Sequence, residues 1–419
     1  MHRKTLLDNG IRIVTEHIPH VQSVSIGIWV KTGSRDENKE KNGIAHFIEH
    51  MLFKGTKKRS ALQIAKEIDA VGGILNASTG REYTNFFAKV LHKDFDLAID
   101  LLSDIFLKSL FPSHEVKRER GVILQEIKMV EDTPDDYVQD LFSQNFFPGH
   151  PLGCPILGNY ATITKINRPK LAGFFQNYYL NPLRIIVSVA GKLNHERVVE
   201  AIGRTLGRIK PKEEARMWSP PEVFPGIKIF NKDLEQVHLC LGSIGLPHTH
   251  PSRYAGYILN VILGGSMSSR LFQEIREKRG LAYAIFSYNA SFQDTGILTI
   301  YAGTARDNLK KVIELIMNEL RKLKKNPLKK IELEKAKDQL KGNILLMWEN
   351  TDVRMSRLAT GEIYFEKYIP LGHVLTAIER VTVDDVQSLS QELFQKKYFA
   401  LVALGKVNGR DIVPNLLDL

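Results

Sequence analysis

Stretches in which apolar and polar residues alternate are interrupted along the chain by longer stretches in which apolar residues recur with the period of a helix. The alternating stretches predict strands over Ile11–Glu16 and Val24–Thr32 and extended structure over Ile74–Val90, with a turn at Thr79-Gly80. The helical period predicts helices over Gly43–Phe53, Ala61–Val71, Asp94–Leu107 and Ser113–Val130. Strands that follow one another through short turns are typical of antiparallel pairing. We therefore expect an α+β fold of largely antiparallel sheets flanked by helices.

The same pattern of a strand, a polar break and a helix occurs twice at one offset. FFAKVLHKDFDLAIDLL, around Phe87, is matched by IYAGTARDNLKKVIELI, around Tyr301, which lies 214 residues later. LRIIVSVAGKLN ends at Asn194 and YFALVALGKVN ends at Asn408, again 214 residues later. Two separate segments with one offset indicate a duplicated domain.

Residues 211–224 separate the two copies. This stretch is rich in proline and mixed in polarity, and proline favours extended backbone, so we interpret it as a linker. At 419 residues the chain also exceeds what one hydrophobic core usually supports. We predict an N-terminal domain over 1–210 and a homologous C-terminal domain over 225–419.

Charge gives little support to a nucleic-acid-binding protein. The formal net charge is +11, from 58 Lys and Arg against 47 Asp and Glu, but the two signs are mixed along the chain. The densest basic stretch, Arg321–Lys337, passes into an acid-containing helical pattern and carries no interleaved aromatics that could stack on bases. We expect no nucleic-acid partner.

The chain has neither a membrane-spanning pattern nor a cysteine framework. The longest apolar run, near Ile185–Ala190, is far too short to cross a bilayer. Two isolated cysteines, Cys154 and Cys240, make neither a disulfide scaffold nor a cysteine metal site. We therefore expect a cytoplasmic protein with no membrane association.

The segment GIAHFIEHMLFKG, from Gly43 to Gly55, contains the candidate catalytic and metal-binding residues. On a helix, His46, Glu49 and His50 stand at positions i, i+3 and i+4, so they project from one face of an otherwise apolar helix. Polar groups crowded there are costly unless they bind something. Catalytic zinc is commonly held by two imidazoles and one carboxylate, and a neighbouring carboxylate can take a proton from water. The order H-x-x-E-H is the inverted zincin arrangement.

A third ligand has to come from another element. The predicted helix Ser113–Val130 offers His114, Glu115, Glu119 and Glu126. Glu119 and Glu126 are two turns apart and share a face, with apolar residues between them on the same side. Either could be the ligand, and spacing alone does not separate them.

HFIEHMLFKG, a glutamate 76 residues after His50, and the duplicated half together resemble the M16 family of insulinase, pitrilysin and mitochondrial processing peptidase. The resemblance covers essentially the whole chain, whose length is similar to that of the short, single-half branch. It implies one Zn²⁺ per chain, with His46, His50 and Glu126 as ligands and Glu49 as general base. It also implies that Glu119 is a carboxylate supporting the ligands, as zinc sites usually require.

The resemblance extends to substrate binding. The segment LGGSMSSRLFQEIREKRGLAY of the second copy looks like the family's glycine-rich loop and its arginine–tyrosine pair, here Arg276 and Tyr283. A cation and a phenol are suitable donors to an oxyanion. The stretch Gly72–Phe87 looks like the family's substrate-pairing strand, with Asn76 and Ala77 at the contact positions.

The family pattern implies that two homologous domains form half of a clamshell closed by a second half. In a chain of this length the second half is another chain, so we expect a homodimer or a heterodimer with a related subunit. The expected activity is hydrolysis of short unfolded peptides or leader sequences by a zinc metalloendopeptidase. The alternative is a non-catalytic partner subunit, which would be expected to have lost either the zinc residues or the Arg–Tyr pair.

Overall fold

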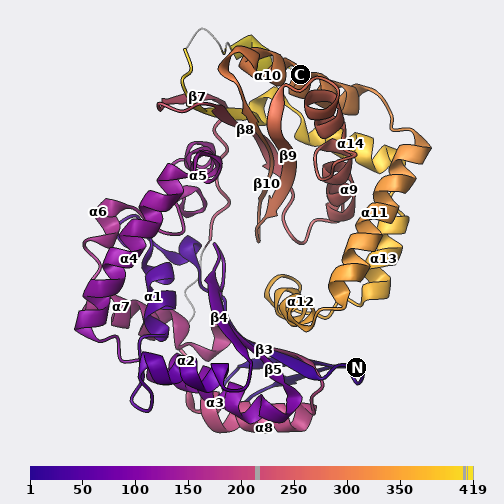
Figure 1. Ribbon diagram of the computed structural model, residues 1–419. Coiled ribbons are helices and arrows are strands. Elements are labelled where there is room, and N and C mark those ends of the chain that lie inside the picture. The colour runs from indigo at the N-terminus through magenta and orange to yellow at the C-terminus, as the bar shows by residue number, and fades with distance from the viewer. Residues whose placement is uncertain (213–217, 409–411, 413, 419) are drawn as a thin grey trace. The chain divides into compact units, whose positions relative to one another are not determined.

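The computed structural model describes residues 1–212, 218–408, 412 and 414–418 (Figure 1). The described chain divides into two compact units, each built around one β-sheet. The first unit comprises Met1–Met129, Cys154–Met217 and Met347–Tyr368. The second comprises Val130–Gly153, Trp218–Leu346 and Ile369–Leu419.

The first unit contains a six-stranded sheet of order β1-β2-β6-β3-β5-β4. All neighbouring strands pair antiparallel except β2 and β6, which run parallel. β4 therefore forms one edge of the sheet and β1 the other. The strands are β1 His2–Leu6, β2 Arg12–His17, β3 Ser23–Val30, β4 Ile74–Thr79, β5 Thr84–Leu91 and β6 Ile185–Gly191.

The second unit contains a five-stranded sheet of order β7-β11-β8-β10-β9, which repeats β2-β6-β3-β5-β4 position by position. Its one parallel pair, β7 with β11, matches β2 with β6. The predicted duplication and the α+β class of two homologous, largely antiparallel domains are thereby confirmed. The strands are β7 Gly226–Asn231, β8 Val237–Gly245, β9 Ala282–Ser291, β10 Gly296–Thr304 and β11 Ala400–Gly405.

Helices cover both faces of each sheet. In the first unit α3 and α8 lie against one face and α12 against the other (Figure 1). The helices of the first half of the chain are α1 Ile44–Leu52, α2 Ala61–Asp69, α3 Phe95–Lys108, α4 Ser113–Asp132, α5 Pro134–Phe146, α6 Tyr160–Ile163, α7 Arg168–Phe174 and α8 His195–Thr205. Those of the second half are α9 Arg253–Leu263, α10 Leu309–Lys325, α11 Lys330–Trp348, α12 Thr351–Tyr364, α13 Leu371–Glu379 and α14 Val383–Leu393.

Two helices belong to the unit that is built mainly from the other half of the chain. α5 packs on β8 and β11 of the second sheet, and α12 packs on β2, β3 and β6 of the first. The compact units therefore differ from the continuous stretches 1–210 and 225–419, because each sheet has an apolar face that a helix from the other half covers. The division at the linker stays a prediction of where the repeats meet, and residues 213–217 of that linker lie outside the described residues.

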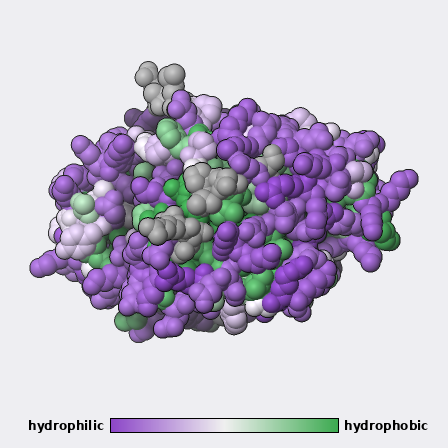
Figure 2. Space-filling model, turned by 90° about the horizontal axis from the view of Figure 1, so that it is seen from above, coloured by the Kyte–Doolittle hydropathy of each residue, from purple (hydrophilic) through white to green (hydrophobic). Residues whose placement is uncertain are grey.

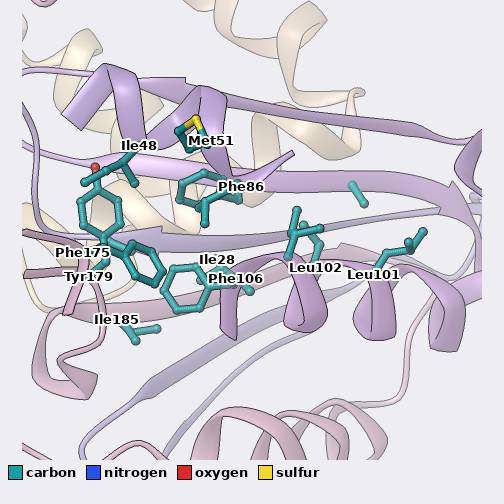
Figure 3. Close-up of a cluster of buried hydrophobic side chains, with 14 of the residues drawn as sticks. Ile28, Ile48, Met51, Phe86, Leu101, Leu102, Phe106, Phe175, Tyr179 and Ile185 are labelled. Atoms are coloured by element: carbon teal, nitrogen blue, oxygen red, sulfur yellow. The ribbon is translucent and has the colours of Figure 1, made fainter. Parts of the chain in front are cut away.

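The core of the first unit lies between its sheet and helices α1 and α3. In Figure 3, Ile48 and Met51 of α1 lie beside Phe86 of β5 and Tyr179. The Tyr179 hydroxyl is 3.0 Å from Thr84 Oγ1 and 3.5 Å from the Ala45 carbonyl oxygen that accepts from it. The helix predicted to carry the ligands is thus anchored in the largest apolar cluster of its unit.

The predicted elements of the first copy agree with the structure to within a few residues. The apolar periods located α1, α3 and α4 correctly, and the turn predicted at Thr79-Gly80 does end β4. Among the described residues, no helix combines the length and apolar composition needed to span a bilayer. Figure 2 shows hydrophilic residues over most of the face seen from above, with small apolar areas between them.

Candidate metal centre

Helix α1 presents three partly buried positions between fully buried ones. Its apolar residues are all buried: Ile44, Ala45, Phe47, Ile48, Met51 and Leu52. His46, Glu49 and His50 are the three residues of the helix that keep some exposure. The i, i+3, i+4 spacing therefore places these three side chains on one face, as the sequence predicts.

Three donor atoms from α1 and α4 converge beside this face. Glu126 Oε2 is 3.9 Å from His46 Nε2 and 3.6 Å from His50 Nε2. The two imidazole rings stand edge to face, with centroids 4.6 Å apart. The three ligand atoms all lie within 4.8 Å of one another, and they form the one such cluster of histidine, cysteine or acidic groups in the described part of the chain.

The chemistry of these donors fits a divalent zinc ion. Glu126 Oε2 and His46 Nδ1 are buried, and neither has a hydrogen-bond partner among the described residues. A buried carboxylate oxygen without a partner is costly, and a cation between it and two imidazole nitrogens would satisfy it. Burial, and secondarily the charge of His50, lowers the pKa of His46 to about 3, so its imidazole is neutral, as ligation requires.

Glu119 lies behind the cluster rather than in it. Its side chain is almost fully buried, and its Oε2 is 3.2 Å from His50 Nδ1, the ring nitrogen that faces away from Glu126. Its Oε1 lies 2.8 Å from Lys54 Nζ, so the carboxylate has a charged partner of its own. The structure thus gives different neighbours to the two glutamates that the sequence leaves open as ligands.

Glu49 lies on the same helix face, but its carboxylate has a partner on the sheet. The hydroxyl of Thr79, the last residue of β4, donates to Glu49 Oε2 at 2.5 Å. Burial raises the pKa of Glu49, and the hydrogen bond from Thr79 offsets part of that shift. The other acidic candidates of α4 lie elsewhere, since Glu115 pairs with Arg118 and with the exposed His114.

Strand β4 is an edge strand, so one side of its backbone has no neighbouring strand among the described residues. Asn76 and Ala77 pair with Phe87 and Phe86 of β5 on the other side. The Asn76 side chain accepts a hydrogen bond from the Ala77 N–H at 2.8 Å, so this edge donor already has a local partner. An incoming peptide would have to displace that contact.

The second unit brings Arg276 and Tyr283 together. Arg276 lies in a π-helical turn, Phe272–Glu277, and its guanidinium is 5.8 Å from the ring centroid of Tyr283. Tyr283, near the start of β9, is 77% exposed. The pair is thus accessible and positively charged, in keeping with a predicted role in binding an oxyanion.

Three residues around the centre are absent from the predicted site: Thr79, Lys54 and Glu37. Thr79 shares its strand face with Leu75 and Ala77, which pack on the core side, so the period of two could have placed it toward α1. Glu37 accepts hydrogen bonds from the first turn of α1, and no local motif indicates it.

Comparisons with known proteins give one consistent result. The family model for insulinase, peptidase family M16, matches residues 12–159. The model for the peptidase M16 inactive domain matches residues 165–340. The first match contains all the residues of α1 and α4 described above.

Similar proteins align over nearly their whole length. A Bacillus subtilis protein named uncharacterized zinc protease YmxG is 42% identical, covering 95% of this chain and 97% of its own. A Streptomyces coelicolor protein named uncharacterized zinc protease SCO5738 is 39% identical, covering 94% and 88%. The crystal structure of a protease from Helicobacter pylori matches with a TM-score of 0.89 and 25% identity, covering 97% of this chain and 99% of that one. A peptidase M16 inactive domain from Pseudomonas fluorescens shares the fold at 20% identity, with a TM-score of 0.87, covering 97% and 98%.

Proposed function

Since this chain belongs to the insulinase family, peptidase family M16, we propose that it is a zinc-dependent endopeptidase acting on short unfolded peptides or leader sequences. The observation that carries the proposal is the convergence of His46 Nε2, His50 Nε2 and Glu126 Oε2 beside Glu49. These atoms would hold one Zn²⁺ per chain. The names of the relatives support zinc as the metal.

The proposed chemistry assigns a proton to Glu49. When bound, Zn²⁺ would polarise the scissile carbonyl and make a water molecule more acidic. Glu49 accepts the proton of that water as the water oxygen adds to the carbonyl carbon. The same carboxylate then delivers the proton to the amide nitrogen as the C–N bond breaks. Glu119 orients His50 through Nδ1 and leaves Nε2 free to bind the metal.

The substrate would bind as an added strand along β4. Main-chain hydrogen bonds to an edge strand recognise an extended peptide with little regard for its sequence. Asn76 and Ala77 would contribute these contacts, with the Asn76 amide giving up the Ala77 N–H. Unfolded peptides fit this mode, because their backbone N–H and C=O groups are free to pair along β4.

Arg276 and Tyr283 would stabilise the oxyanion, and we propose that the active form is a homodimer or a heterodimer with a related subunit. A pair acting in trans would make activity depend on protein concentration. The rival function, a non-catalytic partner subunit, is less well supported because the zinc residues, Arg276 and Tyr283 are all present.

The test is cleavage of an unstructured peptide of twenty to thirty residues by zinc-loaded protein, read by mass spectrometry. Glu49→Gln should lose at least about 100-fold in rate, because general base catalysis supplies roughly that factor, while its zinc content stays equal to that of the wild type. The matched control is Glu115→Gln, which changes a glutamate of α4 outside the centre and should leave the rate unchanged.

The outcomes separate the two functions. Cleavage by the wild type and the control alone supports the peptidase. Inactivity of all three proteins with full zinc favours the partner subunit. Cleavage by Glu49→Gln at the wild-type rate would overturn the assigned role of Glu49.

A further inference from the structure

The segment Gly33–Glu37, which contains the 3₁₀ turn Ser34–Asp36, touches both elements that carry groups of the centre. On one side it lies alongside the turn between β4 and β5. Its backbone donates from Ser34 N to the Gly80 carbonyl at 3.1 Å and from Arg35 N to the Arg81 carbonyl at 2.7 Å. A methyl group on Gly33 would come within 2.4 Å of the Gly80 carbonyl oxygen, so the two backbones are as close as glycine allows.

A buried ion pair locks this contact. Arg35 Nη1 lies 2.6 Å from Glu82 Oε1 in the turn, and both side chains are 1% exposed. Replacing such a pair by apolar residues of similar volume is often neutral or stabilising, because removing two charges from water costs about as much as their attraction returns. Net stability is therefore a weak explanation for the pair, and a role in fixing the register of the turn is a better one.

On its other side the segment caps α1. Glu37 Oε2 accepts from Gly43 N at 2.8 Å and from the Asn42 side chain at 3.0 Å, and Glu37 Oε1 accepts from Ala45 N at 2.8 Å. The residue at the N-cap position is Gly43, which has φ +91° and no side chain to cap the first turn. Glu37 supplies that cap from six residues upstream. The helix has only nine residues, and His46 is its third.

The two contacts meet at Thr79 and Glu49. Thr79 ends β4 immediately before the turn held by Arg35, and its hydroxyl donates to Glu49 on the helix held by Glu37. The segment therefore sets how the turn and α1 stand relative to each other, and the hydrogen bond at 2.5 Å is formed across that junction.

We infer that Gly33–Glu37 is a brace that holds α1 in register with the β4–β5 hairpin, so that Thr79 fixes the carboxylate of Glu49 for proton transfer. Thr79, Arg35 and Glu37 are thus positioning residues for the reaction. The inference rests on the proposed function, in which Glu49 is the base.

The first test compares Thr79→Val with Thr79→Ser in zinc-loaded protein. Thr79→Val removes the hydroxyl while keeping the shape, and kcat should fall about 10- to 100-fold with KM changed less than about 3-fold, because a misplaced base slows chemistry rather than binding. Thr79→Ser keeps the donor and should restore kcat to within about 3-fold of the wild type. Zinc content and the absorption spectrum of the Co²⁺-substituted proteins should not change, since the ligands lie on α1 and α4.

The second test separates register from stability. The double variant Arg35→Met/Glu82→Leu should lose kcat to a similar extent as Thr79→Val. Its control is Arg354→Met/Glu16→Leu, which removes a two-pronged ion pair with contacts of 2.5 and 3.0 Å between α12 and β2 of the same unit. The control should shift the melting temperature comparably without lowering kcat.

Three results would overturn the brace: wild-type kcat in Thr79→Val, no recovery in Thr79→Ser, or an equal loss in the control pair. A wild type that is inactive with full zinc would refute the proposed function instead. In that case, crystal structures of zinc-loaded wild type and Thr79→Val decide about the brace. An unchanged Glu49 carboxylate in the variant would refute it, and a displaced one would support it.

Discussion

Helices α1 and α9 lie against the edge strands of two sheets with the same strand order, yet they carry different chemistry. From Ile44 to Leu52 and from Ala255 to Leu263, the order of buried and partly buried residues is identical. Superposing the two patterns puts Tyr257, Asn260 and Val261 opposite His46, Glu49 and His50. The duplicated fold thus needs an apolar helix at this place and leaves the same three positions open in each copy.

A hydrogen bond from the edge strand to this helix occurs in both units. Ser287 of β9 donates to Asn260 Oδ1 at 2.7 Å, as Thr79 of β4 donates to Glu49 Oε2 at 2.5 Å. In the second unit this bond links two neutral groups. The reactive centre thus consists of a few side chains on helix positions that the two copies of the fold fill differently.

The largest expected effect follows from making α1 like α9. His50→Val should abolish zinc binding and lower the cleavage rate by about 10³-fold or more, because several kcal/mol of metal assistance are lost. Metal-free stability should fall by about 1–3 kcal/mol, because valine fits the matching place in α9 but leaves the buried Glu119 Oε2 without its hydrogen bond from His50. Zinc per chain by atomic emission and denaturation in chelator measure both. The control Val261→His should bind no additional zinc, and a second zinc there would show that α9 and its neighbours also supply metal ligands.

A smaller effect on zinc binding is expected from changing Glu119, which contacts the predicted ligand His50. Glu119→Gln should weaken zinc binding about 10- to 100-fold, the usual range for a carboxylate that orients a ligating histidine. An amide cannot accept from both His50 and Lys54 as the carboxylate does. Competition with a chelator of known affinity measures the change. An unaltered zinc affinity would show that His50 needs no orienting partner.

The cap of α1 gives a pH-dependent prediction, because α9 begins without a side-chain cap among the described residues. Burial outweighs the three hydrogen bonds and raises the pKa of Glu37 from 4.5 to about 8. The folded state therefore holds this proton more tightly than the unfolded state. Its stabilising contribution is complete below about pH 4.5 and is lost as the pH rises through 8.

Glu37→Gln cannot titrate and isolates this contribution. The wild type should exceed the variant in free energy of unfolding at pH 5, and the difference should shrink by on the order of 3 kcal/mol by pH 8. Urea denaturation of both metal-free proteins at the two pH values measures it. A difference that stays constant or grows with pH would mean that Glu37 is ionised throughout.

The smallest effect concerns the matching bond of the second unit. Ser287→Ala should cost about 1 kcal/mol, the usual value of one hydrogen bond, and lower the melting temperature by a few degrees. The cleavage rate should stay within about 2-fold, in contrast to Thr79→Val. Calorimetry and peptide cleavage provide the two readings. A loss of rate as large as that of Thr79→Val would erase the distinction between the two units.

Local pattern sufficed for the elements of the centre but not for its connections. The spacing of His46, Glu49 and His50 determines one helix face, whatever surrounds it. Glu119 and Glu126 share a face too, so their different neighbours depend on how α4 lies against α1, which no periodicity encodes. Thr79 and Glu37 act across the junctions between elements, where only the folded chain brings the partners together.

The exchange of α5 and α12, in which each helix covers the sheet built mainly from the other half of the chain, cannot be predicted from the sequence for a similar reason. The apolar faces of α5, with Val138, Leu141 and Phe142, and of α12, with Met355 and Leu358, show that each helix covers something. A hydrophobic stripe identifies a buried face, but it does not identify the sheet that buries it.

That exchange has a consequence for synthesis on the ribosome. The last strand of the first sheet, β6, ends at Gly191, but the helix that covers the sheet's second face ends only at Tyr364. Synthesis proceeds at roughly 5–20 residues per second, so the apolar face formed by Trp29 and Ile186 stays uncovered for about 10–35 s, until α12 has been synthesised. During that interval the uncovered apolar face of the first sheet is accessible to chaperones and proteases.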